Sequence, residues 1–373
     1  MRKKKILFIF GTRPEGIKLA PLIKKFKEDK DFEAITCITS QHREMLMQVV
    51  DYFNLPIDFD LNVMIENQSL DYITSRTVEK LEDVFANVKP DLVIVQGDAT
   101  TSFIGALSSF YHKVPVAHIE AGLRTFDKNF PYPEELNRCL ITQISDLHFA
   151  PTKNAVNNLK LEHIPDERIF LVGNTTIDAQ LHTIGYVEKN IEIFKDKFKF
   201  IDFNKKVILV TCHRRENFGQ PFIEICNALL EIAQKFKEIE IVFPVHLNPN
   251  IRQIAFTILK APNIFLLDPL DYPSMLFLMK NSYLIVSDSG GIQEEAPTFG
   301  KPVIVLREKT ERIESIELGI SVKVGANKDR IIHWIEQLLT DSEQYSKMSK
   351  ICFPYGDGTA SEKIYKNIKE YFV

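Results

Sequence analysis

The chain has 373 residues, of which 45% are hydrophobic and 26% are charged, and its formal net charge is −4. This length exceeds what one ordinary hydrophobic core supports and predicts two domains of roughly 150 to 200 residues each. Acidic and basic residues nearly balance, which argues against a nucleic-acid partner, because binding a phosphate backbone calls for an excess of basic side chains.

Two further features limit the class of protein. The basic run at residues 2–5 precedes five apolar residues, which are too few for a signal peptide or a membrane span and instead predict a first strand. The five cysteines are scattered and contain no C-x-x-C pair, which argues against disulfides and against a zinc site. We therefore expect a reduced, cytoplasmic enzyme without a metal site or a membrane segment.

Short apolar runs alternate with longer amphipathic stretches, a pattern typical of βαβ units with buried parallel strands. They predict an α/β fold with two Rossmann-like, doubly wound domains in tandem and a boundary within residues 174–200. The last helix, from about residue 360, has one apolar face that must dock elsewhere. The expected strands lie near residues 6–10, 34–39, 92–96, 114–119, 147–149, 169–172, 206–211, 240–245, 264–267, 283–287, 303–306 and 321–324.

The loop at residues 11–18, GTRPEGIK, lies between the first predicted strand and a helix. It is neither a Walker loop nor the G-x-G-x-x-G turn of a dinucleotide-binding fold, so neither ATP nor NAD is indicated. Arg13 and Lys18 place two cations at the start of a helix, beside the positive end of its dipole, which suits a diphosphate. The equally weighted alternative is that both are solvated surface charges.

Several carboxylates follow predicted strands of the first domain. Asp98 is either a helix N-cap or a site residue. Glu120 ends a buried strand, at the edge where open α/β sheets place their sites, and is the better candidate for catalysis. Glu134 and Glu135 begin a helix, where acidic residues complement the dipole, so each has a purely structural alternative. Together these carboxylates supply groups for proton abstraction and return.

Basic residues occupy the matching edge of the second domain. His213, with Arg214 and Arg215, follows the strand at 206–211, and His246 follows the next strand. Such residues can stabilise a leaving phosphate and position a proton. The alternative is a solvated basic turn.

The stretch at residues 287–296, SDSGGIQEEA, predicts a strand end, a glycine turn and a helix start. Ser289, Gly290 and Gly291 let backbone N–H groups approach phosphate oxygens. Glu295, one turn further on, suits a neutral pair of hydroxyls such as those of a ribose. An ordinary glycine-turned helix cap is the alternative.

A series of motifs then identifies a family. They are GTRPEGIK at 11–18, QHREM at 41–45, QGD at 96–98, HIEAGLRT at 118–125, PEELNR at 133–138, HRREN at 213–217, PVHLNPN at 244–250, SDSGGIQEEAP at 287–297, TER at 310–312 and PYGDG at 354–358. In this order, and over essentially the whole chain, they resemble the non-hydrolysing UDP-N-acetylglucosamine 2-epimerases.

The resemblance implies a glycosyltransferase-B-like fold with the nucleotide sugar in a cleft between two domains. The first would span residues 1–174 and the second, which binds UDP, residues 175–358, with the C-terminal helix 359–373 packing back on the first. The implied reaction inverts carbon 2 of UDP-N-acetylglucosamine by eliminating UDP to 2-acetamidoglucal and adding it back, giving UDP-N-acetylmannosamine. It needs no redox cofactor or metal. A homodimer that serves cell-envelope polysaccharide biosynthesis is also implied.

The resemblance carries roles onto individual positions. The family's acid–base and leaving-group residues match Asp98, Glu120, Glu134 and His213, without fixing which takes the first proton. Its UDP-sugar contacts match Arg13, Lys18, Met275, Ser289, Gly290, Gly291, Glu295 and Arg312. Bacterial members also bind a second UDP-N-acetylglucosamine as an allosteric activator, and the matching positions are Gln41, Gln68, Glu135, Arg214 and His246.

Some positions depart from the family pattern, and they keep alternatives open. Met275 stands where an aromatic residue is common and could loosen packing on uracil, and an atypical loop at 126–130 could admit a modified sugar. The alternatives are a 2-epimerase of another UDP-2-acetamido sugar, a hydrolysing epimerase that releases free N-acetylmannosamine, a retaining glycosyltransferase, and a non-catalytic nucleotide-sugar sensor. The other departures are Gly16, Ala99, Cys212 and Ile313.

Overall fold

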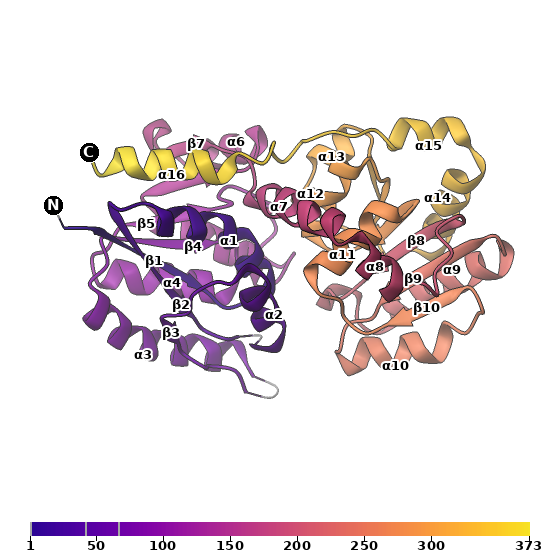
Figure 1. The fold of residues 1–373 in the computed structure, drawn as a ribbon, viewed down its shortest axis with the longest axis horizontal. Helices are drawn as coiled ribbons and strands as arrows, with labels where there is room; N and C mark the ends of the chain where they lie inside the picture. Colours follow the sequence, from indigo (N-terminus) through magenta and orange to yellow (C-terminus); the bar gives the residue numbers. More distant parts are fainter. Residues whose placement is uncertain (1, 42, 66–67) are drawn as a thin grey trace. The chain divides into compact units, whose positions relative to one another are not determined.

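The computed structural model of the chain describes residues 2–41, 43–65 and 68–373. His42, within the QHREM motif, lies outside the described residues. The chain forms two compact units, the first comprising Met1–Ala179 with Tyr355–Val373 and the second Gln180–Pro354. Figure 1 shows the chain passing from one group of strands and helices to the other, with its last helix back in the first unit.

The first unit is built, within the described residues, on a seven-stranded parallel sheet in the order β3-β2-β1-β4-β5-β6-β7. The order reverses between β1 and β4, which marks the switch point where open α/β sheets bind ligands. Its strands are β1 (Lys4–Phe10), β2 (Phe32–Ile38), β3 (Phe59–Asp60), β4 (Leu92–Gln96), β5 (Val116–Ile119), β6 (Leu147–Ala150) and β7 (Ile169–Leu171). Its helices are α1 (Arg13–Glu28), α2 (Arg43–Phe53), α3 (Leu70–Val88), α4 (Thr100–Tyr111), α5 (Glu134–Ile144), α6 (Lys153–Leu161), the start of α7 (Thr175–Lys189), and α16 (Ala360–Tyr371).

The second unit repeats this architecture with a six-stranded parallel sheet in the order β10-β9-β8-β11-β12-β13, counted over its described residues. The switch point lies between β8 and β11. Its strands are β8 (Lys206–Thr211), β9 (Ile239–Pro244), β10 (Ile264–Leu267), β11 (Leu284–Ser287), β12 (Val303–Val305) and β13 (Ser321–Lys323). Its helices are α8 (Ile191–Lys197), α9 (Gln220–Lys235), α10 (Pro249–Ile258), α11 (Tyr272–Asn281), α12 (Gly290–Glu295), α13 (Glu314–Glu317), α14 (Lys328–Thr340) and α15 (Ser342–Met348), with short 3-10 turns η1 (Asp166–Arg168), in the first unit, η2 (Arg215–Asn217) and η3 (Ala296–Phe299).

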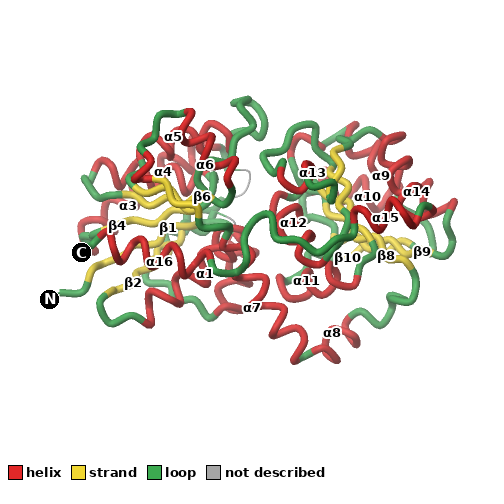
Figure 2. The backbone as a smooth tube through the Cα atoms, turned by 90° about the horizontal axis from the view of Figure 1, so that it is seen from above, coloured by secondary structure: helices red, strands yellow, loops and turns green. Residues whose placement is uncertain are grey.

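The cores explain why the strands are continuous apolar runs. Figure 2 shows helices around each group of strands, and residues of the central strands are fully buried, as for the run Ile6–Phe10 of β1. Strands covered on both faces cannot alternate with polar residues. The predicted α/β fold with two doubly wound sheets is therefore confirmed. One strand was missed, because β3 has only two residues and leaves no apolar run.

The last helix packs within the first unit, against α1 and the start of β2. The ring of Tyr365 meets the edges of Phe26 and Phe32, with centroids 5.3 and 6.2 Å apart. Asp29, at the end of α1, accepts hydrogen bonds from the hydroxyl of Tyr365 and, at 2.8 Å, from the ammonium of Lys369. These contacts give the apolar face of α16 its partner.

Candidate active site

The first turn of α1 is shaped by a buried carboxylate. Oε2 of Glu15 accepts hydrogen bonds from the amides of Gly11 at 3.0 Å and Thr12 at 2.8 Å, and Oε1 accepts from the hydroxyl of Ser102 at 2.5 Å. Burial raises the pKa of Glu15, although these hydrogen bonds oppose the rise. A Cβ atom on Gly11 would come within 1.9 Å of Oγ1 of Thr39, so only glycine fits there. The turn sets Arg13 at the first position of α1.

Glu120 lies at the carboxyl end of β5, beside the switch point of the first sheet. Glu120 is only 5% exposed, and its backbone φ is +69°, a left-handed conformation that residues other than glycine seldom adopt. Oε2 accepts from Nε2 of Gln96 at 3.1 Å and from Nδ2 of Asn174 at 2.9 Å, and it forms an ion pair with the buried ammonium of Lys18. Hydrogen bonds and a cation of this kind favour the ionised carboxylate.

The position of Lys18 differs from the simplest reading of its motif. Its ammonium contacts Glu120, and the two side chains are 8% and 4% exposed. A cation so enclosed acts first on the carboxylate beside it. The predicted contact of Lys18 with a diphosphate stays a prediction.

Asp98 follows β4 and is joined to α5. Arg138 forms ion pairs with Asp98 and, at 2.9 Å, with Glu135, and Asn137 donates to the backbone carbonyl of Asp98 at 2.9 Å. Burial alone would lower the pKa of Arg138, but the two carboxylates outweigh it and raise the pKa. The arginine therefore stays charged and fixes Asp98 at the sheet edge. Glu134, half-buried, begins α5 as predicted.

Glu135, a predicted activator ligand, is occupied inside the unit. It is 2% exposed, and its Oε1 accepts from the amides of Thr125 and Phe126, both at 2.9 Å. Two other predicted activator residues contact each other, because Nε2 of Gln68 donates a hydrogen bond to the backbone carbonyl of Gln41 at 2.9 Å. The role of all three in binding a second ligand stays a prediction.

In the second unit, His213 follows β8 and is held by Asp288, which follows β11. Asp288 is fully buried and accepts from the amide of His213 at 3.0 Å, the amide of Arg214 at 2.9 Å and Nδ2 of Asn217 at 2.9 Å. Its Oδ1 lies 3.5 Å from Nδ1 of His213. Burial would raise the pKa of Asp288, but the charge of His213 and these hydrogen bonds lower it. An ionised Asp288 thus orients the imidazole.

The imidazole of His213 also stacks on that of His246, with centroids 5.9 Å apart and planes inclined by 23°. The structure therefore brings together the two histidines that the sequence placed at neighbouring strand ends. Nδ1 of His246 accepts the amide of Asn248 at 3.1 Å, which fixes this ring in turn.

The predicted anion site lies at the start of α12. Ser289 is the N-cap, and its amide donates to Oγ of Ser287 at 3.0 Å. Arg312 lies against this turn, because a Cβ on Gly290 would come within 2.8 Å of the guanidinium carbon. Glu294, at 2.9 Å, and Glu311 both form ion pairs with the same guanidinium. An arginine therefore lies against the glycine turn, and the predicted binding of an anion there stays a prediction.

Glu295, predicted to bind a ribose, lies beside α11. Its Oε1 accepts from the hydroxyl of Tyr272 at 2.5 Å, and its backbone carbonyl accepts from Gln180 at 3.0 Å. Tyr272 and Met275 are buried on the same helix. Met275, predicted near the uracil, thus belongs to the element that contacts Glu295.

Several residues of this arrangement were missed by sequence reasoning. Three of them, Gln96, Arg138 and Asp288, lie inside the quoted motifs, at strand ends or on α5. Their membership of these motifs could have marked them as site residues. Asn174 follows β7 outside the quoted motifs, and Tyr272 has only its place at the start of a helix.

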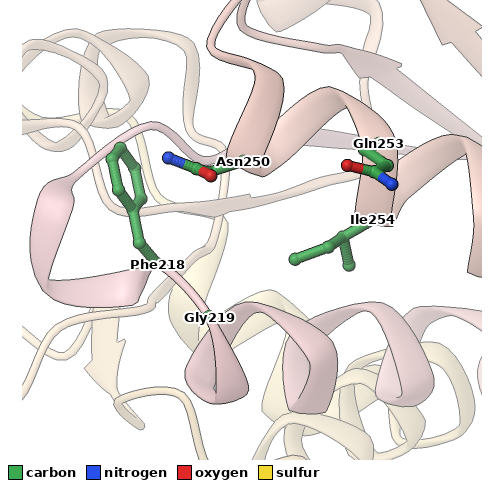
Figure 3. Close-up of a pocket in the computed structure, with 5 residues that line it drawn as sticks. All are labelled: Phe218, Gly219, Asn250, Gln253 and Ile254. Carbon is green, nitrogen blue, oxygen red and sulfur yellow. The ribbon is translucent and has the colours of Figure 1, made fainter.

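One pocket in the second unit does not coincide with these residues. A pocket of about 390 Å³ lies between α10 and the turn that precedes α9, and it is lined by Phe218, Gly219, Asn250, Gln253 and Ile254 (Figure 3). None of these five described residues is ionisable, so the pocket lacks the groups that proton transfer requires.

Among residues 2–41, 43–65 and 68–373, no group of three or more His, Cys, Asp or Glu side chains could hold a metal ion. No helix in the described part of the chain has the length and apolar character needed to cross a membrane.

Comparison with known proteins gives consistent matches. Residues 24–369 match the UDP-N-acetylglucosamine 2-epimerase family. The Yersinia pestis UDP-N-acetylglucosamine 2-epimerase is 48% identical over 373 residues, covering 99% of both chains, and that of Escherichia coli K12 is 47% identical over 369 residues, covering 98% of both.

Solved structures match equally well. That of UDP-GlcNAc 2-epimerase from Neisseria meningitidis bound to UDP-GlcNAc superposes with a TM-score of 0.96 at 45% identity, covering 98% of this chain and 100% of the other. The Methanocaldococcus jannaschii enzyme in complex with UDP-GlcNAc and UDP gives 0.89 at 35% identity, covering 98% and 99%. A glycosyltransferase at 11% identity, with a TM-score of 0.63, shares the fold alone.

Proposed function

This chain belongs to the UDP-N-acetylglucosamine 2-epimerase family and is therefore an isomerase, and on that premise we propose that it interconverts UDP-N-acetylglucosamine and UDP-N-acetylmannosamine without hydrolysis. The observation that carries the proposal is Glu120, a carboxylate kept buried at the sheet's switch point by an ion pair and amide hydrogen bonds. Such an enclosed base suits removal of a weakly acidic C–H proton.

The reaction is an elimination followed by an addition. A carboxylate removes the proton from carbon 2 of the sugar, the bond between carbon 1 and the UDP oxygen breaks, and a carbon–carbon double bond forms, giving 2-acetamidoglucal and UDP. A proton then returns to carbon 2 from the opposite face as the UDP oxygen bonds to carbon 1 again. Atoms and electrons balance without a redox cofactor, a metal or water.

We assign the proton transfers to the carboxylates of the first unit, Asp98, Glu120 and Glu134. The ion pair with Arg138 fixes Asp98 at the end of β4, the strand next to the one that Glu120 follows, which supports a second proton-transfer role for Asp98. We propose that Lys18 serves Glu120 directly, because its ammonium lies on that carboxylate.

In the second unit, we propose that UDP is bound at the start of α12. The hydroxyl of Ser289, the amides of Gly290 and Gly291 and the guanidinium of Arg312 would hold the diphosphate. Arg13 is a further candidate contact. Glu295 would accept from the ribose hydroxyls and Met275 would pack on uracil. His213, oriented by Asp288, would stabilise the phosphate as UDP leaves.

The test is proton NMR of UDP-N-acetylglucosamine incubated with the enzyme in deuterated water. Deuterium at carbon 2 together with UDP-linked N-acetylmannosamine is the expected result. Accumulating free N-acetylmannosamine would instead indicate the hydrolysing reaction, and transfer of the sugar to an acceptor would indicate a glycosyltransferase. Absence of exchange would refute every epimerase assignment, and exchange only on a modified UDP-2-acetamido sugar would change the substrate.

We further propose that the protein is a cytoplasmic homodimer, that its product feeds cell-envelope polysaccharide synthesis, and that it binds a second UDP-N-acetylglucosamine as an activator. Analytical ultracentrifugation measures the oligomeric state. Activation is measured from the reverse reaction, because UDP-N-acetylmannosamine alone should react slowly until UDP-N-acetylglucosamine is added. Ala variants in which added UDP-N-acetylglucosamine no longer accelerates the reverse reaction would identify the activator residues, for which the candidates are Gln41, Gln68, Glu135, Arg214 and His246.

A further inference from the structure

Asn174 lies where the chain leaves the first unit. The chain passes from the first unit to the second after Ala179 and returns at Tyr355. The amide of Asn174 donates to the carbonyl of Tyr355 at 2.6 Å, so the outgoing and returning segments are hydrogen-bonded to each other. Asn174 is 2% exposed and Tyr355 1%, so this junction is closed to solvent.

Two glycines allow the segments to approach so closely. Gly173 and Gly356 have φ of +93° and +124°. A Cβ on Gly356 would come within 3.1 Å of both the amide nitrogen of Asn174 and the Cα of Gly173. Positive φ and this contact together require glycine at both positions, which fixes the backbone around Asn174.

The side chain of Asn174 uses both ends of its amide. Oδ1 accepts the amide of Thr176 at 3.1 Å, in the first turn of α7. Nδ2 donates to Oε2 of Glu120 at 2.9 Å. The opposite orientation of the amide would place Oδ1 of Asn174 against the carboxylate oxygen of Glu120, so the hydrogen bonds determine the orientation. The side chain of Asn174 thus connects the first turn of α7 directly to Glu120.

The hydrogen bond from Asn174 affects both the charge and the orientation of the Glu120 carboxylate. α7 spans Thr175–Lys189 and so continues across the point where the two units divide. A hydrogen bond from a neutral amide favours the charged form of a carboxylate and restricts its rotation. Oε2 of Glu120 also faces the ammonium of Lys18 and Nε2 of Gln96, both from other elements of the first unit. Of these three partners, Asn174 is the one whose position is set by the backbone of the segment that joins the units.

We propose that Asn174 is a positioning residue for the reaction, which holds Glu120 ionised and oriented from the connection between the two units. The inference rests on the proposed function, in which Glu120 transfers a proton. A purely structural role, in which Asn174 only caps α7, predicts different effects of substitution.

The test uses two variants that keep an acceptor for the Thr176 amide and remove the side-chain amide that donates to Glu120. In Asn174→Ser the hydroxyl can still accept the Thr176 amide, and in Asn174→Asp the carboxylate can do so with an unchanged side-chain volume. The matched control is Asp178→Ala, also on α7, which removes hydrogen bonds to the amides of Ala360 at 3.2 Å and Ser361 at 2.7 Å and does not involve Glu120.

The readout is the pH profile of kcat/KM for epimerisation, with thermal unfolding of each variant recorded alongside. The acidic limb should move to higher pH by roughly one unit in Asn174→Ser, and further in Asn174→Asp, where a second negative charge faces Glu120. Asp178→Ala should lower Tm and leave the acidic limb unchanged.

An unchanged acidic limb in either folded Asn174 variant would overturn the inference, as would an equal shift in Asp178→Ala. If the unsubstituted enzyme itself gives no exchange at carbon 2, the proposed function fails instead. The two failures are therefore distinguishable.

Discussion

The ion pair between Lys18 and Glu120 supports a quantitative prediction for Lys18→Met. The two side chains are 8% and 4% exposed, so removal of the ammonium leaves a buried negative charge. Breaking a buried pair in this way costs about 3 to 5 kcal/mol of unfolding free energy. Gln96 and Asn174 still donate to the carboxylate at 3.1 and 2.9 Å, which favours the lower value, about 3 kcal/mol.

A loss of this size corresponds to a fall in Tm of roughly 6 to 12 °C for a unit of this length. The double variant Lys18→Met/Glu120→Gln removes both charges, and the new amide can still accept from its neighbours. We expect the double variant to be more stable than Lys18→Met, with a coupling energy of about 2 kcal/mol. Lys27→Met, on an exposed position of the same helix, should change stability by less than about 0.5 kcal/mol.

The assay is denaturant unfolding and calorimetry of the nucleotide-free protein. A Lys18→Met variant as stable as the parent, or single losses that simply add in the double variant, would refute the reasoning. A lysine that served only the diphosphate would give that result, and its loss would appear instead as a higher KM with free-enzyme stability unchanged.

Two further predictions follow from the described contacts. Glu120→Gln and His213→Asn should each fold and lose at least about 100-fold in turnover, as expected for acid–base groups, and near-normal turnover measured by NMR would remove that residue from the mechanism. The hydrogen bond from Lys369, and after it the one from Tyr365, lowers the pKa of Asp29 from 3.8 to about 2. The stability that these contacts provide is therefore complete above about pH 4 and is lost as the pH falls toward 2. Acid unfolding should show this loss in the parent and not in Asp29→Asn, and equal acid profiles would count against the contact.

Much of the fold followed from local sequence. Apolar runs predicted the strands on both sides of each switch point, and the motif glycines predicted the turn before α12, because hydrophobic periodicity and backbone preference act over a few neighbouring residues. The same reasoning missed β3, whose two residues pair with β2 only in the assembled sheet. It singled out Glu120 from its place at a strand end.

What only the tertiary structure decided is which groups face one another. Lys18 and Glu120 are 102 residues apart, His213 and the Asp288 that orients it 75, and Asn174 and Glu120 54. No spacing rule connects such positions, because their partners are set by strand order and by the packing of helices on the sheets. The sequence by itself therefore determined the fold class, the family and the candidate residues. The pairing of charges around those residues required the folded chain, since electrostatic interactions depend on distance in space and burial, not on separation along the backbone.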